Sequence, residues 1–221
     1  MSNVTFDNIR GSEEIKTYIE EADHSLVALG YTEHSYAHVL KCAAMASSLL
    51  KKLGYSNREA ELAEIAAYMH DIGNVINRAD HAQSGAIMAF RILDNMGMDA
   101  IEIAKVITAI GNHDEKTAFP VNAIAAALIL ADKTDVRRSR VRNKDRVNFD
   151  IHDRVNYAAT DSFVTLELEL KTVTMHVKID TGICAVMDYF EIFIGRMLLC
   201  RKAAEFFNLK FKLNINGSDI M

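Results

Sequence analysis

Apolar residues recur at intervals of three and four along most of the first 140 positions, which predicts a series of amphipathic helices. The segment 101–109 illustrates the pattern, since Ile101, Ala104, Ile107 and Ala109 share one helical face. Glycines follow several apolar segments, as expected where helices end. We therefore expect helices over residues 12–29, 35–53, 56–70, 79–96, 99–111 and 122–142.

The pattern changes to strict alternation after about residue 143. Two segments, 164–170 and 173–179, alternate apolar and polar residues and predict a hairpin of half-buried strands. A long helix over 182–207 and a short strand over 210–215 are expected to follow. The fold class is therefore mainly α, with a helical core of residues 1–143 and a C-terminal α+β appendage of residues 144–221.

Composition supports a helical protein in a reducing compartment. The chain of 221 residues has only ten glycines and one proline, too few for the many turns of a sandwich or barrel. Its three cysteines are scattered through apolar segments, which is typical of reduced thiols. The polar N-terminus is neither a signal nor a transit peptide. Charged residues interrupt the long apolar stretch 183–207, so no membrane span is expected. We expect a cytoplasmic protein.

Two acidic positions stand out because they interrupt apolar helices. His70 and Asp71 end the apolar segment ELAEIAAYMHD, and Asp132 follows about ten almost wholly apolar residues. Burying such side chains is costly unless something binds them. Imidazole and carboxylate groups at these positions are suited to a shared metal ion.

These residues resemble the HD superfamily of metal-dependent phosphohydrolases. That family is marked by an early histidine, an adjacent His-Asp pair and a late aspartate on a helical core. His38 matches the first mark, His70 and Asp71 within MHDIGN match the pair, and Asp132 within LADKTD matches the last. The resemblance covers about residues 30–140. His34, four residues before His38, is an alternative first ligand, but the spacing of Ala43 and Ala46 favours His38.

Two further histidines indicate a second metal ion. His81 and His113 lie between the His-Asp pair and the final aspartate, as in two-metal members such as the HD-GYP diesterases and the bacterial dinucleoside-polyphosphate hydrolases. The resemblance implies that they bind the second ion, with Asp71 as the bridge. Asn74 stands where HD-GYP members carry a lysine, and the GYP tripeptide is absent, so hydrolysis of cyclic-di-GMP is not predicted. His24, His152 and His176 lie in no recognisable pattern.

The predicted reaction is hydrolysis of a phosphoester or phosphoanhydride by a metal-activated water. One or two divalent transition-metal ions are expected; the resemblance favours iron or manganese, while zinc, nickel, cobalt and magnesium are alternatives. Asp71 and His113 are the expected catalytic residues, with Asp114 and Glu115 as groups that orient the His113 imidazole.

Basic residues suggest where phosphate groups bind. Arg78, eight residues after His70, could supply the contact that the missing lysine does not. Residues 133–146 hold seven basic residues against two acidic ones in a chain of net charge −5. If the last helix continues through this segment, Lys133, Arg137 and Arg138 would grip a phosphate beyond the one attacked. The expected ligand is a phosphorylated small molecule, most simply a nucleotide, rather than a nucleic acid or a membrane.

A regulatory role is the alternative to catalysis. A module with intact ligand residues but weak activity could sense nucleotides, with the C-terminal region serving as a partner surface, a regulatory lid or a homodimer interface. A nucleotide retained without hydrolysis would distinguish this role from that of an enzyme.

Overall fold

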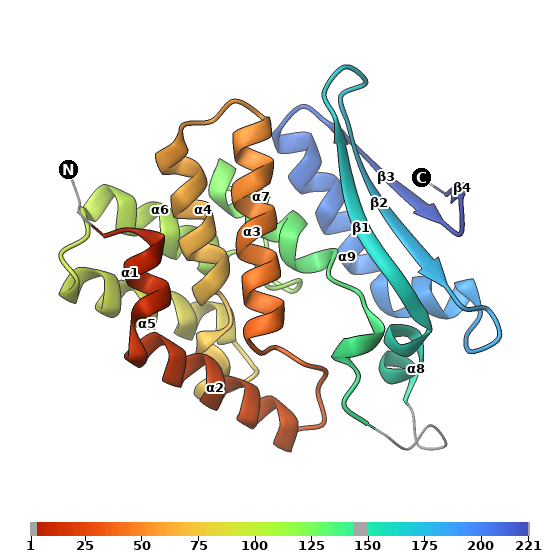
Figure 1. Cartoon of the computed structure of the whole chain (residues 1–221), viewed down its shortest axis with the longest axis horizontal. Coiled ribbons are helices and arrows are strands. Elements are labelled where there is room, and N and C mark those ends of the chain that lie inside the picture. Colours follow the sequence, from red (N-terminus) through yellow and green to blue (C-terminus); the bar gives the residue numbers. More distant parts are fainter. Residues whose placement is uncertain (1–3, 144–149, 221) are drawn as a thin grey trace. The chain divides into compact units, whose positions relative to one another are not determined.

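The computed structural model describes residues 4–143 and 150–220 and divides the chain into two compact units, residues 1–132 and 133–221 (Figure 1). Helices dominate the first unit, and the second combines a small sheet with helices. The predicted class, a helical core with a C-terminal α+β region, is thereby confirmed. The division comes directly after Asp132 instead of near residue 143.

The helices of the first unit begin and end close to the expected positions. They are α1 (Phe6–Gly11), α2 (Glu13–Ala28), α3 (Tyr36–Lys52), α4 (Asn57–Met69), the 3-10 turn η1 (Ile72–Val75), α5 (His81–Asn95), α6 (Ala100–Gly111) and α7 (Ala123–Lys133, whose last residue begins the second unit). Side chains cap the N-termini of α1 to α4 and of α6, as at Ser56, which forms a capping box with Glu59. The short helix α1 was not expected from the sequence.

Small apolar residues allow these helices to pack closely. On α4, Ala60, Ala63, Ala66 and Ala67 are fully buried, and this helix packs along α3. The apolar residues 124–131 of α7 are buried as well. The metal-ligand candidates therefore emerge from a tightly packed helical core.

The second unit contains η2 (Arg138–Arg140), α8 (Ile151–Ala158), β1 (Ala159–Glu167), β2 (Thr172–Ile179), α9 (Val186–Phe206), β3 (Lys210–Ile215) and β4 (Ser218–Asp219). The predicted hairpin is β1–β2, which pair antiparallel. Strand β3 then pairs with β2 in parallel after the crossover through α9, and the sheet order is β1-β2-β3-β4. Figure 1 shows α9 lying along one face of this sheet.

Alternation along the strands separates the two faces of the sheet. Val173, Met175 and Val177 of β2 are buried, and the Tyr189 hydroxyl of α9 contacts the sulfur of Met175. The intervening residues His176 and Lys178 therefore lie on the opposite face. This second face carries mainly polar side chains.

The helix expected over 122–142 ends at Lys133 instead. Asp135 is fully buried and accepts a hydrogen bond from Arg137, while Arg140 donates to the Asp135 carbonyl. β-Branched Thr134 and Val136 flank this aspartate and weaken helical propensity. This local polar network replaces the next helical turn, so the basic residues do not continue along one face of α7.

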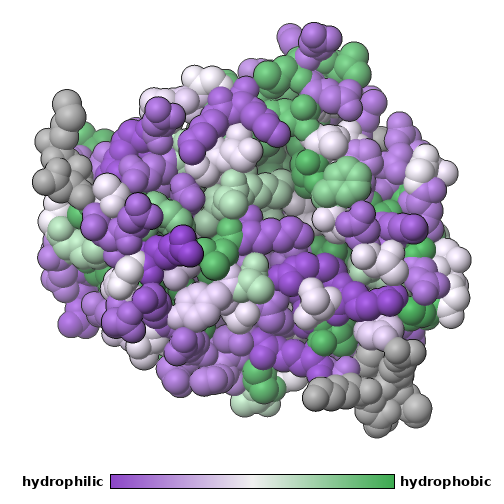
Figure 2. Space-filling view, in the orientation of Figure 1, coloured by the Kyte–Doolittle hydropathy of each residue, from purple (hydrophilic) through white to green (hydrophobic). Residues whose placement is uncertain are grey.

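No helix among the described residues is long and apolar enough to cross a membrane. Hydrophilic side chains cover much of the visible face in Figure 2, with hydrophobic residues scattered between them.

Candidate metal centre

Six imidazole and carboxylate side chains from separate elements of the first unit gather in its core. His38 lies on α3, His70 caps the end of α4, and Asp71 precedes η1. His81 begins α5, His113 follows α6, and Asp132 lies near the end of α7. All six are buried. The structure thus brings together every metal-ligand candidate of the sequence.

A close backbone contact sets the distance between the His-Asp pair and α5. A Cβ atom at Gly73 would lie 2.1 Å from the carbonyl oxygen of His81 and 2.5 Å from the amide nitrogen of Gly85. Only glycine permits this approach. The contact brings His81 into the cluster although it lies ten positions after Asp71 in the sequence.

Three of the imidazoles are held in one tautomer by the backbone. Nδ1 of His70 lies 2.7 Å from the carbonyl oxygen of Ala67. Nδ1 of His81 lies 3.0 Å from the carbonyl oxygen of Arg78. Nδ1 of His113 lies 2.6 Å from the carbonyl oxygen of Ile110. A carbonyl can only accept, so each Nδ1 carries the proton. In the neutral ring, Nε2 then offers a lone pair, which is the form that binds metal.

The ligand atoms form two groups that share Asp71. In the first group, His38 Nε2 lies 3.3 Å from Asp132 Oδ1, and His70 Nε2 lies 3.2 Å from Asp71 Oδ2. In the second, His81 Nε2 lies 3.6 Å and His113 Nε2 lies 3.9 Å from Asp71 Oδ1. The two oxygens of Asp71 therefore face different groups, an arrangement suited to two ions with a carboxylate between them.

Buried atoms at the centre of the cluster show that these residues fit metal ions. His70 Nε2 and Asp71 Oδ2 are buried and make no hydrogen bond, although they lie close together. Nε2 of His81 and Nε2 of His113 face each other at 3.2 Å, so that one cation could accept both lone pairs. A cation between such atoms would remove the cost of burying them.

The charges of the cluster are coupled. Burial opposes a charged imidazole at His70, but the neighbouring Asp71 and Asp132 carboxylates outweigh it and raise the pKa of His70. Burial likewise opposes the charged form of Asp71, yet His70, His34 and His81 hold the pKa of that carboxyl well below its usual range. Asp71 is therefore ionised and ready to bind a cation.

A family model covers all six candidate ligands. The model of the HD domain matches residues 35–138. These residues therefore have the sequence of an HD domain. An uncharacterized protein of Methanocaldococcus jannaschii is 25% identical, over 62% of this chain and 61% of its own length, so this chain spans less than two thirds of that relative. The chain is also similar to the crystal structure of a predicted HD superfamily hydrolase from an uncultured Thermotogales bacterium, with 28% sequence identity and a TM-score of 0.45. The match covers 56% of this chain and 67% of that chain.

Within the HD domain, the structure brings His38 and not His34 into the groups of ligand atoms. The Nδ1 of His34 donates to the Thr32 carbonyl, and its ring lies 5.5 Å from that of His38. Cys42, one turn after His38, places its sulfur 3.6 Å from His38 Nδ1 and belongs to a third candidate ligand group. No sequence motif had assigned this thiol a place at the site.

Asn74 and Arg78 extend the cluster at its edge. The Asn74 amide donates to Oδ1 and to the carbonyl of Asp71, both at 2.9 Å, and its own oxygen accepts from Arg78 at 3.1 Å. The same Arg78 nitrogen lies 3.4 Å from Nε2 of His81. The asparagine that replaces the lysine of related families thus positions an arginine beside the ligands.

Tyr31 is a residue that sequence reasoning missed. The guanidinium carbon of Arg78 lies over the Tyr31 ring, 5.4 Å from its centroid. Tyr31 is 45% exposed. Tyr31 stands in the connection between α2 and α3, where no motif marks it. Only the fold reveals its proximity to Arg78.

The His113 ring has an orienting partner that the sequence did not predict. The Ile110 carbonyl at the end of α6 accepts from Nδ1 of His113 and fixes its ring. The expected roles of Asp114 and Glu115 stay predictions.

The basic residues after Asp132 have local partners. Arg137 bonds to Asp135, and Arg138 donates to the Tyr157 carbonyl and lies over the Tyr157 ring. Lys133 ends α7, directly after the ligand candidate Asp132. Lys144 and Arg146 lie outside the described residues. Phosphate binding by Lys133, Arg137 or Arg138 stays a prediction, without the shared helical face that motivated it.

Proposed function

We propose that this HD protein is a metal-dependent phosphohydrolase that cleaves a phosphoester or phosphoanhydride bond of a nucleotide. The observation that carries the proposal is the buried cluster around Asp71, in which His70 Nε2 and Asp71 Oδ2 lie together without hydrogen bonds. The match of residues 35–138 to the HD domain, a domain of metal-dependent phosphohydrolases, supports the same reaction class.

His38, His70, Asp71 and Asp132 would hold one ion, and Asp71, His81 and His113 a second. The mixed nitrogen and oxygen donor set suits iron or manganese, with zinc, nickel, cobalt and magnesium as alternatives. Bound divalent ions supply Lewis acidity that lowers the pKa of water and neutralises phosphoryl charge.

The protein's own contribution is orientation and charge. Backbone carbonyls fix three imidazoles, and Asn74 fixes both the Asp71 carboxylate and the Arg78 side chain. Because Arg78 stands beside the ligand atoms, its forked donors are placed to bind a phosphate oxygen at the centre. Arg78 thereby takes over the charge that a lysine at position 74 would provide.

Tyr31 supports an organic phosphate as substrate. Its exposed ring beside Arg78 offers an aromatic surface next to the phosphate contact. Stacking of a base on such a ring contributes about 1–3 kcal/mol. An inorganic polyphosphate would gain nothing from it, whereas a nucleotide would.

The metal assignment is tested by elemental analysis of the double variant His70→Ala, Asp71→Ala. We expect the natural chain to hold one or two transition-metal ions and this variant to lose them. The chain offers a matched control in another His-Asp pair, His152 and Asp153 on α8, whose double alanine variant should keep its metal. Unchanged metal content in the first variant would contradict the assignment.

The reaction is tested with a panel of nucleotides and small phosphoesters in the presence of Mn²⁺ or Fe²⁺. We expect turnover of at least one nucleotide, and Arg78→Ala should raise its KM, while Arg91→Ala on exposed α5 surface should not. Metal-loaded protein that turns over no member of the panel but retains a bound nucleotide would instead favour the regulatory role.

A further inference from the structure

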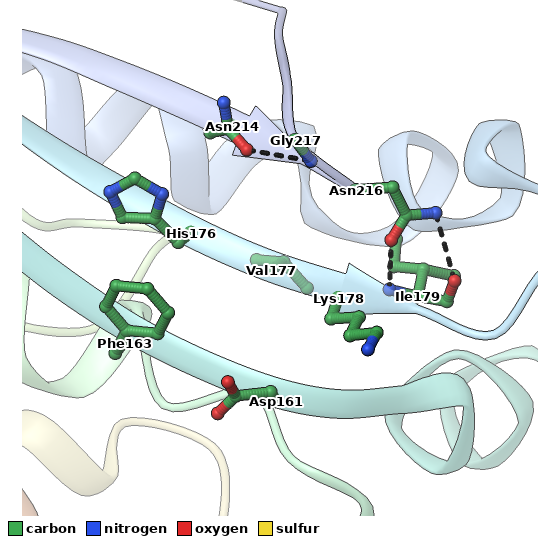
Figure 3. Close-up of a pocket in the computed structure, with 9 residues that line it drawn as sticks. All are labelled: Asp161, Phe163, His176, Val177, Lys178, Ile179, Asn214, Asn216 and Gly217. Atoms are coloured by element: carbon green, nitrogen blue, oxygen red, sulfur yellow. Dashed lines mark hydrogen bonds between the residues drawn. The ribbon is translucent and has the colours of Figure 1, made fainter.

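The second unit contains a hollow of about 490 Å³ on the face of its sheet that does not meet α9 (Figure 3). Its floor is the end of β2, one wall is β1, and the other is the turn between β3 and β4. All of its lining residues belong to residues 161–217, and none of them is a candidate of the metal centre. Its volume lies within the range of small-molecule sites.

Strand register places two aromatic rings side by side in this hollow. Phe163 of β1 pairs with His176 of β2, and their rings stack with centroids 4.6 Å apart and planes at 11°. His176 Nε2 lies 3.0 Å from the Thr165 hydroxyl, which holds the imidazole in this orientation. Phe163 is nevertheless 51% exposed. An aromatic ring already fixed by a stacked neighbour offers an ordered surface to a further planar ring.

Two opposite charges flank the rings. Asp161 of β1 and Lys178 of β2 are cross-strand neighbours that both line the hollow. Neither the carboxylate of Asp161 nor the ammonium of Lys178 has a hydrogen bond or ion pair with any described residue. Cross-strand neighbours of opposite charge can stabilise a sheet by pairing. Here both charges are left available to a ligand.

In the opposite wall, the turn between β3 and β4, the described amide side chains are already hydrogen-bonded within the protein. The Asn216 amide bonds to both the nitrogen and the carbonyl oxygen of Ile179, at 2.8 and 3.0 Å. Asn214 bonds to Asp219 and to the amide of Gly217. These amides are used in shaping the wall, so recognition falls to Phe163, Asp161 and Lys178.

We propose that this hollow binds a nucleoside monophosphate whose base carries an exocyclic amine. The base stacks on the exposed ring of Phe163, Asp161 accepts a hydrogen bond from the amine, and Lys178 faces the phosphate. A carboxylate only accepts hydrogen bonds, so it favours a base with an amine over uracil, which has none. One nucleotide fills the hollow, and the site requires no hydrolysis and no metal ion.

The test uses the full chain, labelled with ¹⁵N and freed of metal with a chelator so that the metal centre does not compete. AMP, CMP and GMP are titrated separately, with UMP, ribose 5-phosphate and adenosine as probes that lack the amine, the base or the phosphate. We expect shifts of the amide signals of Phe163, His176, Lys178 and Gly217 with the amine-bearing nucleotides. The three control probes should bind about tenfold more weakly.

Matched variants separate this site from a general effect of surface changes. Phe163→Ala and Lys178→Ala should each raise the Kd about tenfold. Leu168→Ala and Lys210→Ala, exposed positions of the same sheet region outside the hollow, should change it less than about twofold. Asp161→Asn should reduce the preference for AMP over UMP.

Three results would overturn the proposal. The first is the absence of shifts at millimolar nucleotide, and the second is shifts confined to the residues around Asp71. The third is much tighter binding of a single-stranded oligonucleotide with shifts along the whole sheet, which would make the face a nucleic-acid surface. Loss of hydrolysis at the metal centre has no bearing on any of these results.

Discussion

Asn74 connects two parts of the metal centre through one amide group. Its nitrogen donates to Asp71, and its oxygen accepts from Arg78. Groups that orient metal ligands commonly change metal affinity by about 10- to 100-fold when they are removed. A single substitution here should therefore disturb a candidate ligand and the proposed phosphate contact together.

Asn74→Ala should weaken Mn²⁺ binding by about 10- to 100-fold and raise the KM for a nucleotide. The Asp71 carboxylate would lose the donor that fixes its plane, and Arg78 would lose its anchor. Calorimetric titration with Mn²⁺ measures the first effect and steady-state kinetics the second. Asn95→Ala, an exposed position at the end of α5, is the control. Equal Mn²⁺ affinity in the two variants would contradict the role of Asn74.

Tyr31→Ala should raise the KM for a nucleotide about tenfold and leave that for a small monoester nearly unchanged. The reason is that only the nucleotide has a ring to stack on Tyr31. Tyr31→Phe keeps the ring and should behave like the natural chain. A similar change for both substrates would show that Tyr31 acts only through the position of Arg78.

The candidate ligands could be named from the sequence. His70, Asp71 and Asp132 interrupt apolar helices, and the resemblance to the HD superfamily supplied His38, His81 and His113. Their orientation could not be predicted. It depends on carbonyls such as that of Ile110, which every residue type carries and which no side-chain pattern marks. Tyr31 was hidden for a similar reason, since its contact with Arg78 joins two loops that only the fold brings together.

At the level of elements, the approach of η1 to α5 determines whether the second group of ligands forms. Gly73 allows backbone to meet backbone there. A methyl group added at Gly195, in the middle of α9, would meet no described atom within 4 Å, so this glycine has no such role. The two glycines therefore provide a matched pair for the same substitution.

Gly73→Ala should destabilise the protein by about 1–3 kcal/mol and weaken binding of the second ion, because η1 and α5 must separate. Gly195→Ala should stabilise it by about 0.5–1 kcal/mol, because alanine is the better helix residue. Denaturant unfolding measures both changes. If both variants lost stability equally, the close contact at Gly73 would not explain the effect.

Helices with regular apolar spacing, such as α3 and α6, were predictable to within a residue or two. The end of α7 was not, because the segment from Lys133 to Arg142 has a composition that a helix tolerates. The buried Asp135 with its arginine partners outweighs that local preference. The hydrophobic pattern likewise predicted strand β3, but its parallel pairing with β2 depends on the path of α9.

At the scale of the whole molecule, the metal centre joins elements from α3 to α7, whereas the sheet lies in the other unit. Metal binding should therefore stabilise the first unit selectively. A ligand present at about 100 times its Kd contributes about 2.7 kcal/mol to the stability of the state that binds it.

Chelation should lower the Tm of the first unit and speed amide hydrogen exchange in α4 and α7, with β2 unchanged. Scanning calorimetry and exchange measured by mass spectrometry report these two effects. The His70→Ala, Asp71→Ala variant should not respond to the chelator. Equal acceleration of exchange in β2 would show instead that the two units unfold together.

The sharing of Asp71 between both ligand groups has a consequence for turnover. Two divalent ions would bring twice the charge that Asp71 and Asp132 can neutralise, and Arg78 adds one more positive group. Such a centre holds a positive surplus that a phosphate dianion reduces. In the proposed reaction, a phosphate product would therefore be a good counter-ion, and we expect its departure to limit the rate of the cycle. Inorganic phosphate should then inhibit competitively, and other tetrahedral oxyanions should do the same.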